Sequence, residues 1–173
     1  GRISVEISET LYHGIKSVAK VAQVTPFVVI LTVYALTLGR MSRQTDVLIG
    51  TPVNNRHASE LDSLIGFFVN TLPISVKWTS NSQFVNILKS VSNFYLDAVE
   101  NCYLSFDKIV NCVPINRETN RSPLIQTMFV YNKVETNALK FDNSSCKIHE
   151  VELNVAKFDI TLLLNENNNS VSG

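Results

Sequence analysis

The sequence predicts an α/β domain, an α+β sandwich in which helices pack on a mixed sheet. Segments with the three- to four-residue period of helices alternate with segments that have the two-residue period of strands. Hydrophobic residues make up 45% of the 173 residues and charged residues 17%, so the chain can build a core. Its 15 basic residues balance its 15 acidic residues and form no basic stripe, so we expect no nucleic-acid partner.

The first third of the chain predicts one strand and two helices. Polar and apolar residues alternate over Arg2–Ile7, as in a half-buried strand. From Ser8 to Ala22 the apolar residues recur at three- and four-residue spacing, which indicates an amphipathic helix. Thr25 followed by Pro26 is typical of a helix start, and the second helix is almost uniformly apolar to about Arg40. We therefore expect this second helix to lie inside the domain.

The middle third predicts two strands joined by a polar loop and followed by a helix. The β-branched run Asp46–Val53 reads as a strand that leads into the polar loop Asn54–His57. A helical turn is expected over Leu61–Ile65 and a second long strand over Phe67–Trp78. A helix capped by the side chain of residue 81 or 82 should then run to about residue 100.

The last third predicts a short helix and three strands. The short helical piece covers Ser105–Val110, and the strands cover Gln126–Val134, Lys147–Leu153 and Phe158–Leu163. The Asn- and Ser-rich tail from residue 165 to residue 173 begins no predicted element. Phe158–Leu163 is therefore expected to be an edge strand without a return strand, which suggests that the chain is cut here.

The composition also sets expectations for location and redox state. The most apolar run, Pro26–Leu38, has 13 residues, whereas a membrane span needs about 20. No export signal opens the chain, so we expect a cytoplasmic protein without a membrane partner. The cysteines Cys102, Cys112 and Cys146 form no CxxC pair, so they predict buried thiols rather than a disulfide framework or a zinc site.

Local motifs for catalysis or metal binding are absent from the sequence. The glycines form no phosphate-binding loop, and the histidines belong to no HExxH motif, so no metal site is expected. Each histidine reads as a surface or a hydrogen-bonded core residue, and the carboxylates nearest the polar loop read as capping groups. The histidines are His13, His57 and His149, and the carboxylates are Asp46, Glu60 and Asp62.

One amide stands out because it lies within an apolar strand. Asn70, followed by Thr71, sits among Phe67, Phe68 and Leu72. A buried amide is costly unless its donors and acceptors have partners. The simplest structural interpretation is a hydrogen bond from one strand to another, and the alternative is a functional contact.

These residues resemble the core motifs of one family. The runs 49–56, 60–61 and 64–72 resemble the fourth and fifth core motifs of condensation domains of nonribosomal peptide synthetases. The run 117–124 resembles the seventh motif, and 126–132 resembles the strand that follows it. The motif residues to which we assign a structural role are Gly50, Pro52, Gly66, Phe68 and Pro123.

The resemblance implies a fold and a reaction. Such domains are similar to chloramphenicol acetyltransferase: two α/β lobes face each other across a tunnel. Carrier proteins deliver the donor and acceptor as phosphopantetheine thioesters, and the domain itself binds no cofactor. The signature His-His-x-x-x-Asp-Gly belongs to the N-terminal lobe and does not occur here. Residues 1–173 are therefore expected to be the C-terminal lobe, truncated at both ends, with no catalytic residue of its own and no activity alone.

The same resemblance assigns residues to the walls of the cleft. Arg56 matches the arginine that would reach across the cleft to the Asp of the missing signature. Asn70 and Thr71 would lie near the tunnel and contact substrate or pantetheine. Arg121, with Arg117 beside it in the seventh motif, would be another partner for that Asp or would hold its loop.

Departures from the motifs keep two other functions open. The sixth motif is reduced in Asn101–Asp107 to its Asn, its Phe and its acidic character, and Glu118 and Asn120 replace the usual residues of the seventh. A degenerate module that only docks carrier proteins, or a related acyltransferase, is thus an alternative. The run Phe68–Thr71 favours condensation over epimerization. Expected partners are the N-terminal lobe, carrier proteins and an adenylation domain, and an isolated lobe should self-associate.

Overall fold

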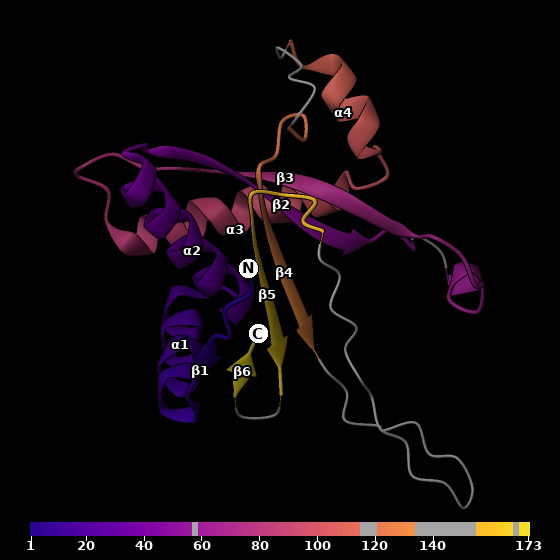
Figure 1. Ribbon diagram of the computed structural model, residues 1–173. Coiled ribbons are helices and arrows are strands. Elements are labelled where there is room, and N and C mark those ends of the chain that lie inside the picture. Colours follow the sequence, from indigo (N-terminus) through magenta and orange to yellow (C-terminus); the bar gives the residue numbers. More distant parts are fainter. Residues whose placement is uncertain (57–58, 115–120, 134–154, 168–169) are drawn as a thin grey trace, which may run out of the picture.

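A computed structural model describes residues 1–56, 59–114, 121–133, 155–167 and 170–173. Its six-stranded mixed sheet has the order β1-β6-β5-β4-β2-β3, and helices pack on it (Figure 1). The predicted α/β class with a mixed sheet is confirmed. The elements are β1 (Glu6–Ile7), α1 (Glu9–Ala22), α2 (Pro26–Ser42), β2 (Asp46–Asn54), the 3-10 turn η1 (Ser59–Leu61), β3 (Val69–Lys77), α3 (Phe84–Glu100), α4 (Phe106–Cys112), β4 (Thr127–Lys133), β5 (Ile160–Glu166) and β6 (Val171–Ser172).

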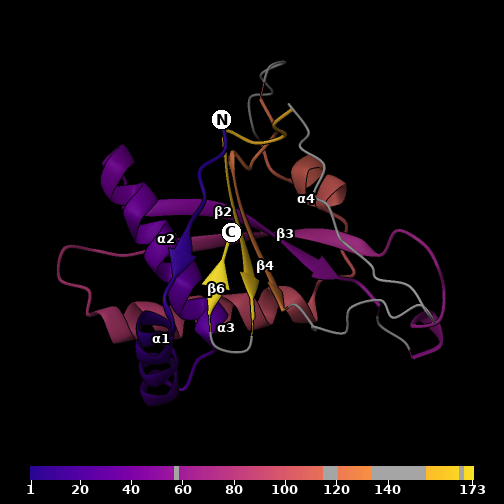
Figure 2. The same ribbon diagram turned by 60° about the horizontal axis from the view of Figure 1, so that its bottom comes forward.

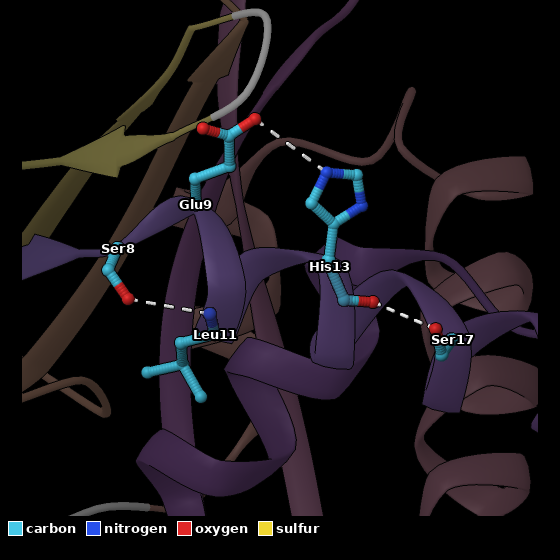
Figure 3. A network of polar contacts seen from close by, with 5 residues as sticks. All are labelled: Ser8, Glu9, Leu11, His13 and Ser17. Atoms are coloured by element: carbon cyan, nitrogen blue, oxygen red, sulfur yellow. Dashed lines mark hydrogen bonds and ion pairs between the residues drawn. The ribbon is translucent and has the colours of Figure 1, made fainter.

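The first two helices begin at the residues that the sequence predicts. The Ser8 hydroxyl accepts a hydrogen bond from the Leu11 amide at 3.4 Å at the start of α1 (Figure 3). The Thr25 hydroxyl accepts one from Val28 at 3.3 Å, with a proline as the first residue of α2. These bonds satisfy amides that have no partner within a helix. His13, predicted as a surface or core residue, lies on the exposed side of α1, 3.8 Å from the Glu9 carboxylate.

The predicted cap of α3 is wrong. Gln83 precedes the first helical residue, Phe84, and makes no capping hydrogen bond through its side chain. The Ser82 hydroxyl instead accepts the Thr79 amide at 2.9 Å, which closes the turn before the helix. A serine in a turn can satisfy its own loop rather than the next helix, and sequence position alone does not decide between the two.

α2 forms the centre of the core, as its apolar composition predicts. Its buried residues pack with α1, α3 and one face of the sheet. The Phe27 ring lies 4.7 Å from the Tyr95 ring of α3 and 5.4 Å from the Phe129 ring of β4, measured between centroids. This aromatic contact joins two helices to the sheet at β4.

A polar network ties α1 to the sheet. The buried Tyr12 hydroxyl lies 3.2 Å from the Tyr131 hydroxyl, which donates to Glu166 at 3.2 Å. Burial raises the pKa of Tyr131 to about 12, and burial together with the Glu166 hydrogen bond raises the pKa of Tyr12. Both phenols therefore stay neutral at physiological pH, and neither has the lowered pKa that a catalytic base would need.

The C-terminal tail is not without structure, which corrects the prediction. β5 runs to Glu166, and Val171 and Ser172 form the return strand β6. β5 lies between β4 and β6, so it is not an edge strand. The physical reason is Val171, which is fully buried among the core residues although its neighbours are polar. One buried side chain with strand pairing on both sides holds a segment that composition predicts to be a loop.

Two further expectations need correction. Cys102 is buried as predicted, but Cys112 is exposed on α4. Asp46 is not a cap: its carboxylate lies 2.9 Å from the Lys77 ammonium on the neighbouring strand. The predicted strand Lys147–Leu153 and Cys146 lie outside the described residues.

The lengths of the helices bear on the question of a membrane span. Within the described residues no single helix is long and apolar enough to cross a bilayer. α1 and α2 reach that length and composition only as a pair, and the pair is bent by 102°.

Candidate active-site wall

The predicted site residues lie on and around the β2–β3 hairpin. The two strands pair antiparallel over their whole length, from Asp46 opposite Lys77 to Asn54 opposite Val69. The Asn55 amide donates to the Phe68 carbonyl at 2.7 Å and closes the loop between them. The hairpin projects at one end of the molecule (Figure 1). The long, regularly paired strands β2 and β3 thus carry the loop that contains Arg56, the arginine of the fourth motif.

Arg56 is committed to its own loop. Its guanidinium donates to the Leu61 carbonyl and, at 2.9 Å, to the Leu64 carbonyl. It also lies over the Phe68 ring, 4.0 Å from the ring centroid. A planar group with several donors can bind two carbonyls and stack on an aromatic face at once, which lysine cannot do. The structure therefore gives Arg56 a positioning role within its own loop, and its contact across a cleft stays a prediction.

Gly66 makes room for the stacked ring. A Cβ atom at this position would lie 2.9 Å from Cε2 of Phe68, closer than real Cβ atoms approach their neighbours. Any larger residue would push the Phe68 ring away from the Arg56 guanidinium. The structural role assigned to Gly66 and Phe68 thus has a steric explanation in this loop.

Asn70 holds the segment between α3 and α4. Its side-chain nitrogen donates to the carbonyls of Cys102 and Leu104 at 2.7 and 2.8 Å. Its side-chain oxygen accepts the amides of Thr71 at 2.9 Å and Phe106 at 3.2 Å. All four partners are backbone groups, so every hydrogen-bonding position of the buried amide is used. The bonds run from β3 to a helix connection and not from strand to strand, which corrects the simplest structural interpretation.

Cys102 takes a part in this site that the motifs do not predict. Its buried thiol lies 3.6 Å from the side-chain oxygen of Asn55, which begins the hairpin loop. Its carbonyl is also one of the two acceptors of Asn70. The available signal was its position in the divergent sixth motif, next to residues that the family pattern keeps. Asn55, Asn70 and Cys102 therefore join both ends of the hairpin loop to the end of α3.

Thr71 and Gly50 lie on the opposite face of the hairpin from Asn70. Successive residues of a strand alternate between faces, and Thr71 pairs with Pro52 of β2. Gly50 is the contact point between β2 and β4, where it pairs with Met128. A Cβ atom at Gly50 would lie 2.9 Å from the Ile125 side chain, so glycine permits the approach of the two strands. Asn70 and Thr71, the site residues of the fifth motif, thus lie on opposite faces of the hairpin.

Arg121 belongs to a second region, just before β4. It lines a hollow of about 280 Å³ together with Gln126, Lys157 and Asp159. The Gln126 side chain donates to the Ser122 carbonyl at 2.9 Å. The Asp159 amide donates to the Gln126 carbonyl at 2.9 Å, so the segment before β4 is fixed to the start of β5.

Pro123 forms the turn between Arg121 and β4. Its carbonyl accepts the Ile125 amide at 2.8 Å across Leu124, whose φ of 68° is left-handed. That backbone conformation is uncommon for leucine, which fits a tightly held turn. Arg117 lies outside the described residues. The chain thus places its described site residues in two groups: Arg56, Asn70 and Thr71 on the hairpin, and Arg121 beside β4.

The described residues contain no group of three or more metal-ligating side chains that could hold an ion. The side chains in contact around the hairpin loop are two amides, a guanidinium and a thiol, from Asn55, Asn70, Arg56 and Cys102, and their partners are mainly backbone groups. This arrangement can hold chain segments in position and so shape one wall of a candidate cleft.

Comparison with solved structures defines the fold. The condensation domain of the Monacolin K polyketide synthase MokA superposes with a TM-score of 0.82 at 18% identity, covering 98% of this chain and 40% of that one. The X-domain from teicoplanin biosynthesis gives 0.84 at 19% identity, covering 100% and 40%. The fold is therefore the chloramphenicol acetyltransferase-like α/β fold of condensation domains.

Sequence comparison defines the family. The sequence model of the condensation-domain family matches residues 1–172. The chain therefore belongs to the condensation-domain family. It is 32% identical over 168 residues to tyrocidine synthase 2 of Brevibacillus parabrevis, covering 96% of this chain and 5% of that protein. It is 31% identical over 172 residues to malpinin synthetase of Mortierella alpina, covering 99% and 2%. The chain thus spans only a small part, 5% or 2%, of the length of these relatives.

Proposed function

We propose that residues 1–173 form the C-terminal lobe of a nonribosomal peptide synthetase condensation domain that makes amide bonds. The match of the condensation model to residues 1–172 carries this proposal. The coverage of only 40% of the MokA and teicoplanin domain chains supports assignment to one lobe. The His-His-x-x-x-Asp-Gly signature would lie in the N-terminal lobe, and its histidine would orient the acceptor amine or manage its proton.

In this proposal the chain positions the substrates and does not itself transfer a proton. Two thioester substrates arrive on the phosphopantetheine arms of carrier proteins, loaded by adenylation domains of the same assembly line, and the lobe binds no cofactor itself. Holding two tethered reactants in line converts their reaction into an effectively unimolecular step. The hairpin loop held by Arg56 and the α3–α4 segment held by Asn70 would form one wall of the tunnel. The cytoplasmic location expected from the sequence belongs to the same proposal.

The divergent sixth motif favours a second candidate, a docking module without catalytic activity. One observation weakens it: Asn70 contacts the backbone of this segment and not its side chains. Side chains from Cys102 to Ser105 can therefore change while the hydrogen bonds stay. A related acyltransferase that uses coenzyme A or one carrier would need the same wall. Both alternatives predict that no amide forms between two loaded carriers.

Amide formation by the parent synthetase tests the proposal. The module that contains residues 1–173 is supplied with donor and acceptor carrier proteins loaded with their substrates, and product on the acceptor carrier is measured by mass spectrometry. We expect product from the module and none from residues 1–173 alone. Product from the isolated chain would refute the division of the site between lobes. No product from an intact module with correctly loaded carriers would refute the proposal and favour the two alternatives, the docking module and the related acyltransferase.

An apolar patch at the tip of the hairpin loop predicts self-association of the isolated chain. Leu64 and Val69 are half-exposed, and Ile65 and Phe67 are almost fully exposed. Such a contiguous patch normally meets a partner, here proposed to be the other lobe. We expect concentration-dependent sedimentation in analytical ultracentrifugation, which Phe67→Ser with Ile65→Ser reduces. Val21→Ser, at a similarly exposed site on α1, is the matched control and should change nothing. Monomeric sedimentation of the unchanged chain at high concentration would contradict this prediction.

A further inference from the structure

A hollow of about 530 Å³ lies at the end of α2, where the chain turns into β2. The loop between β2 and β3 lies at the other end of the hairpin (Figure 2). The hollow is lined by Leu36, Gly39, Arg40, Arg43, Gln44, Thr45 and Trp78. None of these residues belongs to the candidate active-site wall, so the hollow needs an explanation of its own.

The apolar part of the hollow is held in place by the backbone. The Trp78 amide donates to the Thr45 carbonyl at 3.0 Å and so continues the pairing of β3 with β2 by one residue. The Trp78 ring lies against α2 at Gly39, where a Cβ atom would collide with it. Trp78 is nevertheless only half-buried, and together with Leu36 it presents apolar surface to the hollow. An aromatic side chain that is already fixed loses little entropy when a partner covers it.

The charged part of the hollow is basic. Arg40 and Arg43 line it and are exposed, and the lining residues include no carboxylate. Neither guanidinium has an ion pair or a hydrogen bond within the described part of the chain. The nearest carboxylate along the chain, Asp46, is bound to Lys77 at 2.9 Å and accepts the Ser75 hydroxyl at 3.2 Å. Two positive charges beside an apolar surface therefore stay uncompensated.

The end of α2 does not require these charges as caps. The Leu38 carbonyl accepts the Ser42 hydroxyl at 2.9 Å. The Gly39 carbonyl accepts the backbone amides of Arg43 and Gln44, the latter at 2.8 Å. Arg43 has left-handed backbone angles, with φ 57° and ψ 37°, which glycine adopts at lower cost. Glycine would end the helix equally well, so the Arg43 side chain points to a role outside the helix.

We propose that this hollow binds an acidic segment of a partner protein, in which carboxylates lie beside an apolar side chain. The carboxylates pair with Arg40 and Arg43, since a guanidinium can donate two parallel hydrogen bonds to one carboxylate. The apolar side chain covers Leu36 and Trp78 and keeps water away from the ion pairs, which strengthens them. A volume of about 530 Å³ accepts a few side chains of such a segment. The proposal does not depend on amide formation by the parent protein.

The fluorescence of Trp78 tests the proposal, because this is the only tryptophan in the sequence. The probe is a capped peptide with glutamates on both sides of a Leu-Phe pair, titrated into the 173-residue chain at low salt. One control peptide has glutamine in place of every glutamate, and the other has serine in place of Leu and Phe. We expect a saturable change with the acidic apolar peptide and an affinity at least about tenfold lower for either control.

Three outcomes of this titration would overturn the proposal. The first is no saturable change with the acidic apolar peptide. The second is equal affinity for either control peptide, which would reduce the contact to charge alone or to apolar surface alone. The third is an equal change with inorganic phosphate alone, which would assign the hollow to a small anion.

Substitutions in the hollow have matched controls at the end of α1. Arg43→Gly suits the left-handed backbone, so it should leave the free energy of unfolding nearly unchanged and weaken peptide binding by about threefold to tenfold. Its control is Gln23→Gly, at a residue with the same φ of 57° after α1. Arg40→Gln should weaken binding to a similar extent, and its control is Lys20→Gln in the last turn of α1. Full affinity in both arginine variants, or equal weakening in the controls, would contradict binding at this hollow.

Discussion

Replacing Asn70 by leucine should destabilise the chain by about 3–5 kcal/mol and abolish amide formation by the parent module. The leucine leaves the carbonyls of Cys102 and Leu104 and the amide of Phe106 without the partner that now satisfies them. Unsatisfied buried groups cost more than the hydrogen bonds that they lose. The free energy of unfolding in urea, measured on the isolated chain, checks the first part of the prediction.

The control for Asn70 is an amide of the same kind at the surface. Asn132 makes one exposed hydrogen bond, to Asn165 at 3.2 Å, so Asn132→Leu should cost less than about 1 kcal/mol. Asn70→Asp keeps the acceptor bonds to Thr71 and Phe106 and loses the two donor bonds, so it should fall between the two. Equal losses for Asn70→Leu and Asn132→Leu would show that the α3–α4 segment does not depend on this amide.

Replacing Arg56 by lysine should loosen the hairpin loop in the isolated chain and slow amide formation by the parent module by about 10- to 100-fold. Lysine can donate to one of the carbonyls of Leu61 and Leu64 but cannot also stack a flat face on Phe68. The loss is expected to be about 1–2 kcal/mol, felt mainly in the loop. Limited proteolysis of residues 1–173, with cleavage mapped to 56–68, measures it.

The isolated chain separates the two roles considered for Arg56. If Arg56 positions its own loop, Arg56→Lys must increase cleavage there even when the N-terminal lobe is missing. If it acts only through the Asp of the other lobe, cleavage of the isolated chain stays constant and only the parent loses activity. Lys20→Ala, an exposed basic residue in the last turn of α1, is the control and should leave both readouts unchanged.

The sequence predicts the fold wherever local pattern and tertiary packing agree. α1 and α2 begin at Ser8 and Thr25 because both hydroxyls reach an amide of the first turn. The prediction fails at Ser82 because a serine before a helix can satisfy its own turn instead of the helix. It fails in the tail because burial there depends on strands that are distant in the sequence. Ser82 closes its own turn, and Val171 is buried only because β1 and β5 flank it. Burial of one residue in a polar run has no periodic signature.

In the candidate site, too, local motifs predict some features, whereas others depend on tertiary contacts. Motif resemblance selects Arg56 and Asn70, and both are central in the structure. The resemblance does not predict which groups these two side chains contact. Asn70 binds backbone groups between Cys102 and Phe106, and Arg56 binds its own loop. Cys102 is part of the same cluster and is missed because it interrupts a motif. Long-range hydrogen bonds of this kind depend on how a helix end meets a strand, which a single sequence does not encode locally.

The most direct test of whether this chain is one lobe of an active condensation domain lies in its gene. The coding sequence is read for about 200 codons upstream of Gly1, a span set by the typical size of one domain. We predict His-His-x-x-x-Asp-Gly in the same reading frame within that span. A start codon directly before Gly1, or a signature without its second histidine, would contradict the assignment and leave a docking module as the function.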